Sequence, residues 1–254
     1  DMFRRWELTD PLTIPRREFL YGNHYIKDYL SMTVAPGGVG KSTLVLTEVL
    51  AMVTGKPLLG VEPSKKCNAL YFNAEDPLDE VKRRVIAVCQ YYEIKQEEIS
   101  GLMIGSGRET EMLLMAGEDG LMNEKLMNNI AQTIADNDID ALVIDPLASV
   151  INSPESVDNF RLLAKTLSAL ADTSNVAIEI VHHTRKLNHN QDATIEDSRG
   201  GSSLVAAIRS GRILRNMDKS KGTELGINNY IDFFSINMSG KSNLSRPPDK
   251  TQWY

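Results

Sequence analysis

A glycine-rich loop, APGGVGKS (35–42), has the residue types needed to hold an anion. Gly37, Gly38 and Gly40 have no Cβ, so they allow a bulky group to come close to the backbone. The backbone N–H groups around Val39, which lies among these glycines, can therefore turn inward. The loop predicts a binding site for phosphate oxygens.

The residues after this loop supply the other groups that a bound nucleotide needs. Lys41 places a cation on the β- and γ-phosphates, Ser42 completes the shell of a Mg²⁺ ion, and Thr43 reaches the α-phosphate. An apolar strand (30–35) precedes the loop, and a nearly all-apolar helix (42–55) follows it. Strand, loop and helix in this order predict a Walker A motif that binds ATP and Mg²⁺. The alternative is an ordinary glycine-rich turn.

Two acidic residues stand where strands are expected to end. Asp145 closes the apolar run ALVID (141–145), which predicts that its carboxylate orients the magnesium ion. Glu75 follows another strand end, and we assign it to positioning and polarising the attacking water. The alternative for Glu75 is a surface acid in a loop. Asp76 is expected to be the N-cap of a helix that has Pro77 at its first position.

A third strand, VAIEIV (176–181), runs into two adjacent histidines. Neighbouring residues of a strand point to opposite faces, so only one of His182 and His183 is expected to reach the nucleotide. We assign His183 as a sensor of the γ-phosphate. The alternative is a histidine with a purely structural role.

Several arginines are candidates for contact with phosphates. Arg209, Arg212 and Arg215 follow a helix start, and one of them could act as a trans finger on the ATP of a neighbouring subunit. Arg84 lies nine residues after Glu75, where it either faces the phosphates or forms a surface ion pair with Glu80. Solubilising surface charge is the alternative for each arginine.

A polar stretch, TRKLNHNQDATIEDSRGGSS (184–203), interrupts the strand–helix rhythm. Its basic residues stand among acidic ones, so a single copy would bind nucleic acid weakly, whereas several copies around a channel could bind it well. We expect single-stranded DNA to contact this stretch, and the alternative is a solvated loop. The charges are Arg185, Lys186, His189 and Arg199 against Asp192, Glu196 and Asp197.

Composition indicates the compartment in which the protein works and the kinds of partner it can have. The chain has 254 residues, a formal net charge of −6 and a sequence pI of about 5.3, so its surface as a whole does not attract nucleic acid. Cys67 and Cys89 lie in apolar segments, which favours a reducing compartment over disulfides. No apolar run is long enough to cross a bilayer, and the N-terminus has no signal-peptide pattern. These features predict a cytoplasmic protein without a membrane partner.

The order of elements predicts an α/β fold with a mainly parallel central β-sheet flanked by helices. We expect residues 1–29 to be an irregular lead-in that packs on the core and residues 30–254 to be one domain. RILRN and YIDFFSINM predict later strands, antiparallel at one edge. The remaining expected elements are strands at 30–35, 68–73, 141–145 and 176–181 and helices at 42–55, 77–92, 121–137 and 158–173.

Taken together, APGGVGKST, NAEDP, LVIDP, VHHTRK, DSRGGSSLVAAIR and SGKSNLSRPP resemble the plasmid RepA-type hexameric replicative helicases and their RecA-like, AAA-type relatives. The resemblance runs from about Leu20 to the end of the chain. It agrees with the spacing of the acids, because Glu75 closes the strand before the one that ends at Asp145. In AAA+ proteins a glutamate directly follows that aspartate, and Pro146 occupies this position here.

The resemblance implies a RecA-like P-loop ATPase that forms a six-subunit ring around single-stranded DNA and replicates a plasmid, phage or other mobile element. It implies that Arg209 is the finger, and that Lys241 and Asn243, in GKSN, reach the neighbouring ATP. It also implies the roles given above to Glu75 and His183. The alternative is a regulatory ATPase whose nucleotide state switches protein–protein contacts without unwinding DNA.

Overall fold

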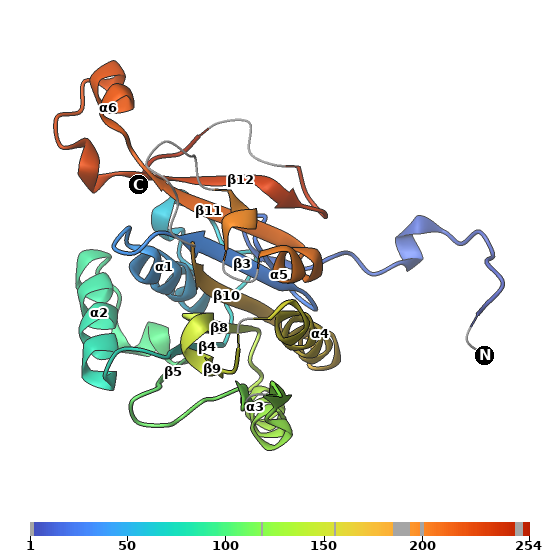
Figure 1. Ribbon diagram of the computed structural model, residues 1–254. Coiled ribbons are helices and arrows are strands. Elements are labelled where there is room, and N and C mark those ends of the chain that lie inside the picture. Colours follow the sequence, from blue (N-terminus) through green and yellow to red (C-terminus); the bar gives the residue numbers. More distant parts are fainter. Residues whose placement is uncertain (1–2, 118, 155, 185–193, 199–200, 247–250) are drawn as a thin grey trace.

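A computed structural model describes residues 3–117, 119–154, 156–184, 194–198, 201–246 and 251–254. Its main feature is a seven-stranded sheet in the order β12-β11-β3-β10-β8-β4-β5 (Figure 1). All neighbours in this sheet are parallel except β12, which is antiparallel to β11. Its strands are β3 (Leu30–Ala35), β4 (Ala69–Asn73), β5 (Leu102–Ser106), β8 (Ala141–Asp145), β10 (Ala177–His183), β11 (Ser210–Asn216) and β12 (Phe234–Ser242).

Helices cover both faces of the sheet, which explains why β3 and β8 are buried along their whole length. Helices α1 and α2 share one core with residues such as Tyr71 and Val143, and α3, α4 and α5 share the other with Leu142 and Ile144. The alternation of side chains along each strand produces the two cores. The helices are α1 (Lys41–Thr54), α2 (Leu78–Tyr91), α3 (Glu124–Asp136), α4 (Val157–Thr173), α5 (Gly201–Ala207) and α6 (Lys219–Leu225).

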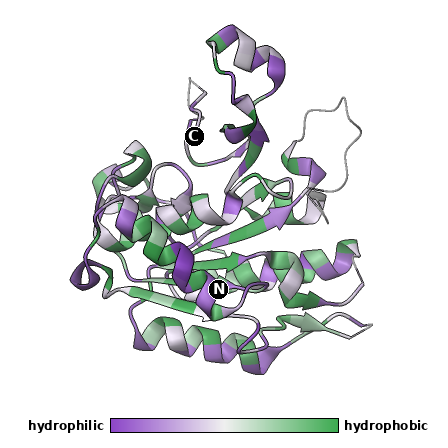
Figure 2. Cartoon of the chain, turned by 90° about the vertical axis from the view of Figure 1, so that its left-hand side faces the viewer, coloured by the Kyte–Doolittle hydropathy of each residue, from purple (hydrophilic) through white to green (hydrophobic). Residues whose placement is uncertain are grey.

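The hydropathy of the chain follows these layers. The strands of the central sheet are largely hydrophobic, whereas the outer helices mix hydrophobic and hydrophilic residues (Figure 2). A helix with one apolar face buries that face against a sheet and leaves the other to water. In the described part of the chain, no helix is both long and apolar enough to cross a membrane.

Strand register brings the strand ends together at one edge of the sheet. His183 of β10 lies opposite Ala35 of β3, and Asp145 of β8 lies opposite Asn73 of β4. We call this edge the carboxyl edge, because the parallel strands end there. In open α/β sheets, ligands bind outside this edge.

The predicted fold class is confirmed, including an antiparallel strand, β12, at one edge. Strand β5 was not expected, although it pairs with β4 over five residues. The third expected helix begins later than predicted, because Leu121–Met122 forms the short strand β7 and Asn123 caps α3. Strand β7 belongs to a small sheet with β6 (Met115–Ala116) and β9 (Ile151–Asn152).

The N-terminal lead-in has two different parts. Strands β1 (Phe19–Tyr21) and β2 (Tyr25–Ile26) form a hairpin whose residues Leu20 and Tyr25 are completely buried. Residues 3–17 are exposed and extend away from the body (Figure 1), so the expectation that the whole lead-in packs on the core is wrong for them. This arm, residues 3–17, carries exposed large apolar side chains: Phe3, Trp6, Leu8, Leu12 and Ile14.

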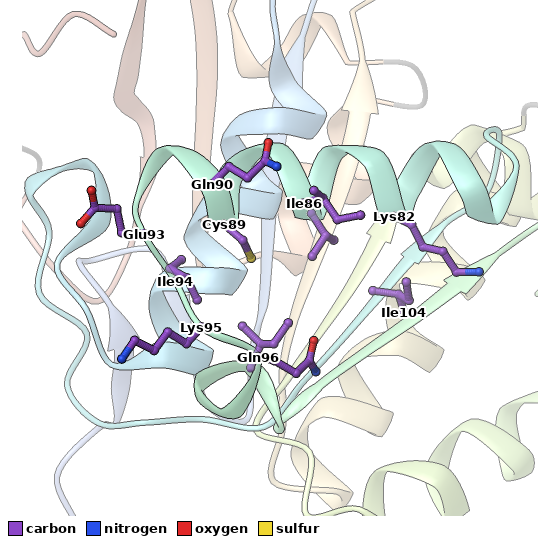
Figure 3. Close-up of a pocket in the computed structure, with 11 residues that line it drawn as sticks. Lys82, Ile86, Cys89, Gln90, Glu93, Ile94, Lys95, Gln96 and Ile104 are labelled. Atoms are coloured by element: carbon purple, nitrogen blue, oxygen red, sulfur yellow. The ribbon is translucent and has the colours of Figure 1, made fainter.

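A groove of about 500 Å³ lies between α2 and the chain that leads into β5 (Figure 3). Its lining is largely apolar and includes Val85, Ile86, Ile94 and Ile104. The groove lies at the edge of the central sheet that is formed by strand β5. None of the residues predicted to hold phosphate or magnesium lines it.

Candidate nucleotide-binding site

The phosphate loop, residues 35–42, joins β3 to α1 at the carboxyl edge. Gly38 and Gly40 have φ angles of +80° and +93°, a region that favours glycine. Among the described residues, a Cβ added at Gly37 or Gly38 would have no atom within 4 Å, so both positions are open on that side. Gly40 is the N-cap of α1, and no side chain caps the first turn of this 14-residue helix. The N–H groups of that turn are therefore available to an anion.

The residues expected to hold magnesium are brought together. Asp145, 1% exposed, accepts a hydrogen bond of 2.7 Å from the hydroxyl of Tyr71. Burial raises the pKa of Asp145, whereas the hydroxyls of Tyr71 and Ser42 and the charge of Lys41 act to lower it. A hydroxyl and a carboxylate are the oxygen ligands that Mg²⁺ prefers, and a bound cation would stabilise the ionised form of Asp145. The residues present fit a magnesium site.

Glu75 is exposed and lies two residues beyond the end of β4. Its Oε1 accepts a hydrogen bond of 2.9 Å from the hydroxyl of Ser149, in the turn that follows Asp145. The N–H of Ala74 donates to the carbonyl of Asp145 at 2.7 Å, which fixes the two strand ends against each other. An exposed carboxylate next to the magnesium residues can hold a water and accept its proton.

The expectation that Asp76 caps a helix is wrong. Helix α2 begins at Leu78, and its N-cap residue is Pro77, with no side-chain cap. The carboxylate of Asp76 instead forms an ion pair with Arg84, with an N–O distance of 2.8 Å, and accepts a hydrogen bond from Asn73 at 3.3 Å. A charged partner offers Asp76 a stronger bond than a backbone N–H would, which accounts for the difference.

Arg84 also lies 3.5 Å from Glu80, so it forms the ion pair that its spacing suggested, besides the pair with Asp76. It is less than one third exposed and stands near the strand end that carries Glu75. Its contact with a nucleotide stays a prediction.

Asn73 shapes the turn that presents Glu75. Its Oδ1 accepts hydrogen bonds from the N–H groups of Glu75 at 3.0 Å and Asp76 at 2.7 Å. From β5 and the residues after it, Ser106 donates to the carbonyl of Asp76 at 2.6 Å, and Arg108 donates to that of Glu75 at 2.8 Å. Sequence reasoning missed these residues. An asparagine two residues before Glu75 is the usual signal of such a turn and would have identified Asn73.

The two histidines at the end of β10 point to opposite faces, as expected. His182 is buried, with its ring 6.3 Å from that of Phe160. His183 is only partly buried and lies opposite Ala35, the first residue of the phosphate loop. His183 is therefore the one next to the nucleotide site, while its role as a sensor stays a prediction.

Arg209, Lys241 and Asn243 lie together, away from the phosphate loop of their own chain. The N–H of Arg209 donates to the carbonyl of Leu30, at the start of β3. The N–H of Asn243 donates to the carbonyl of Arg209, and Lys241 is opposite Gly211. Five residues of parallel strand separate Leu30 from the loop, which corresponds to about 16 Å. We call this end of the sheet the amino edge.

Arg212 cannot be a trans finger, because it is buried. Its guanidinium binds the carboxylate of Glu48 on α1 with two hydrogen bonds, of 2.6 and 2.5 Å, and Nε donates to Thr33 at 2.8 Å. Both charged side chains are less than 5% exposed. The apolar run around Glu48 gave no sign of this partner, which comes from a strand 164 residues later.

Further buried polar side chains surround Arg212 and Glu48 and contact one another. Glu179 of β10 accepts hydrogen bonds from Ser31 and Thr33 and contacts His24 at 3.0 Å. The other ring nitrogen of His24 is 2.9 Å from the hydroxyl of Ser210. We call these residues the buried network: His24, Tyr25, Ser31, Thr33, Glu48, Glu179, Ser210 and Arg212.

The predicted DNA contact lies partly outside the described residues, and its basic residues all do. Arg185, Lys186, His189 and Arg199 are among those outside. Within 184–203, the described residues include a short 3₁₀ turn, Ile195–Asp197, and the start of α5. Thr184 also forms a bridge with Ser198.

The comparisons with known proteins agree with this fold. A family model described as an AAA domain matches residues 4–189, which is well over half of the chain. Among solved structures, the KaiC-like protein PH0186 from the hyperthermophilic archaeon Pyrococcus horikoshii OT3 is similar, with a TM-score of 0.59 at 14% sequence identity. The match covers 91% of this chain and 87% of that one. At this identity the likeness shows the fold alone.

The fold and the site define a RecA-like P-loop ATPase. The chain belongs to the AAA-domain family. ATPases of this class bind their nucleotide with Mg²⁺, which neutralises phosphate charge when it is present. Here residues 37–43 would hold the phosphates, Ser42 and Asp145 would hold the ion, and Glu75 would position the water.

Proposed function

We propose that this ATPase is a ring-forming motor that moves on single-stranded DNA in the replication of a plasmid, phage or other mobile element. The observation that carries the proposal is the separation of Arg209, Lys241 and Asn243 from their own phosphate loop. The resemblance assigns these residues to ATP, yet a lysine or arginine side chain cannot span the roughly 16 Å between the two edges. A neighbouring copy that presents its carboxyl edge to this amino edge would satisfy the assignment.

Such a contact joins different surfaces of two copies, so it is head-to-tail. Head-to-tail contacts produce closed rings or open filaments. The exposed apolar side chains of the arm, residues 3–17, also favour self-association, because contact between copies would remove side chains such as Trp6 and Leu8 from water.

Mixing two inactive variants tests the shared site. Arg209→Ala lacks the finger, and Glu75→Gln lacks the base, so each alone is expected to hydrolyse ATP poorly. In mixed rings some interfaces combine an intact Arg209 with an intact Glu75, and turnover should partly return. The measurement is ATPase rate against mixing ratio, after conditions that permit subunit exchange.

A matched control is Arg161→Ala, because Arg161 is exposed on α4 and, in the described part of the chain, pairs only with the nearby Asp158. This variant should keep normal turnover unmixed. No recovery at any ratio of the two inactive variants, with exchange shown by labelled subunits, would reject the shared site.

A regulatory ATPase without DNA movement is the second candidate function. The even balance of acidic and basic residues in 184–203 favours it. ATP turnover with and without a 30-nucleotide oligothymidylate separates the two candidates. The motor predicts stimulation that weakens steeply as salt rises and that Arg185→Ala with Lys186→Ala removes. A rate of ATP turnover that DNA does not change would favour the regulatory ATPase.

A further inference from the structure

The sheet order sets the direction in which a nucleotide crosses the phosphate loop. Asp145 ends β8 and Glu75 follows β4, and both strands lie on one side of β3. The γ-phosphate must face these acids if they are to orient magnesium and water. The ribose and base then extend to the other side of β3, where β11 and β12 lie.

An aromatic side chain stands beside the phosphate loop on that second side. Phe234, the first residue of β12, is opposite Asn216 at the carboxyl end of β11. A Cβ added to Gly40 would be 3.8 Å from Cε1 of Phe234, so the ring lies against the last glycine of the loop. Phe234 also packs against a small core that contains Val39 and Leu44.

A second ring is stacked on the first. The rings of Phe234 and Tyr254 have centroids 5.8 Å apart and an interplanar angle of 19°. Two backbone hydrogen bonds, Phe234 N–H to Tyr254 C=O at 3.1 Å and the reverse at 2.9 Å, hold the residues together. Trp253 forms a bridge with Ser235 next to them. All three aromatic side chains are only partly buried, so part of this surface is open.

We propose that Phe234 and Tyr254 form the stacking surface for the base of the nucleotide whose phosphates are held by residues 37–43. The inference rests on the proposed nucleotide site. It adds a contact to the base, which is the part of the nucleotide that the phosphate loop does not bind. Aromatic rings stack on any nucleobase, because every base has a π-face. The site would therefore discriminate between nucleotides and base-free phosphates more than between one base and another.

The test compares ligands with and without a base. Dissociation constants for ATP, ribose 5′-triphosphate and inorganic tripolyphosphate are measured with Mg²⁺ on the full chain. We expect ATP to bind at least about 10-fold more tightly than ribose 5′-triphosphate. Phe234→Ala should remove this advantage and leave tripolyphosphate affinity unchanged, whereas Phe234→Tyr should keep it. Tyr91→Ala is the matched control, because Tyr91 is an exposed aromatic on α2.

A spectroscopic readout does not depend on the folding of the Phe234 variants. The chain has two tryptophans, so Trp6→Phe leaves Trp253 as the sole one. ATP should change the emission of Trp253, and tripolyphosphate should not. Equal affinity for ATP and ribose 5′-triphosphate, with no emission change, would overturn the stacking surface while the phosphate site stands. If the wild-type chain binds none of the three ligands, the phosphate site itself is wrong and the stacking surface falls with it.

Discussion

Helix α1 carries polar and charged residues in two opposite situations. Lys41 and Ser42 stand at its open N-terminus, where backbone N–H groups have no side-chain cap. Glu48 lies two turns further on and is enclosed, with both carboxylate oxygens bonded to Arg212. The first set is prepared for a ligand, whereas the second is already satisfied by the protein. The same helix therefore serves function at one end and stability in its middle, and substitutions in the two sets should have separable effects.

The largest expected effect is on nucleotide binding. Lys41→Ala removes the lysine of the phosphate loop, so we expect binding of a fluorescent ATP analogue to be abolished. The midpoint of thermal unfolding should hardly change, since Lys41 is not part of the core. Near-wild-type affinity would contradict the Walker A assignment. A large loss of stability would contradict the separation between a binding role for Lys41 and a stabilising role for Glu48.

The buried network should show the reverse pattern. Arg212→Ala leaves the Glu48 carboxylate buried without its charged partner, at a cost of about 3–5 kcal/mol in the free energy of unfolding. Urea unfolding measures this cost. The double variant Glu48→Leu with Arg212→Met replaces the pair by apolar side chains and should recover most of it. A single variant as stable as wild type would mean that Glu48 is not held as described.

Glu75→Gln tests the site again, with a smaller effect on turnover. Glutamine keeps the shape of the side chain but cannot accept the proton of water, so turnover should fall about 100-fold or more while ATP still binds. Asp76→Asn is the control, because Asp76 pairs with Arg84 rather than facing the site. If Asp76→Asn were the inactive variant and Glu75→Gln stayed active, the two acids would have to exchange roles.

The smallest effect concerns pH. Burial and the charge of Arg212 lower the pKa of His24 below 6.5, although Glu179 and Glu48 oppose this shift. Below pH 6.5 the unfolded chain therefore binds a proton that the folded chain excludes, and stability falls by up to about 1.4 kcal/mol per pH unit. His24→Gln should lack this part of the pH dependence, as urea unfolding at pH 7.5 and 5.5 would show. Identical slopes for both proteins would show that His24 does not exclude a proton.

The sequence predicted those parts of the site that local patterns encode. Glycine spacing, a strand-ending Asp145 and alternating strands and helices follow from the order of residues along the chain, so the loop and the fold class could be foreseen. The partner of Glu48 could not, because Arg212 reaches it only through the arrangement of the sheet. The error at Asp76 has the same origin, since a local cap rule ignored an arginine two helical turns away.

Strand order also sets when the site can form during synthesis. Strand β3 pairs only with β10 and β11, whose residues begin at Ala177 and Ser210. At about 5–20 residues per second, these partners leave the ribosome roughly 7–36 seconds after β3. Until then β3 and the apolar helix α1 have no sheet to join, whereas β4 and β5 can pair early. The phosphate loop is therefore among the last parts of the nascent chain to be fixed, and its flanking segments depend on protection from aggregation for longest.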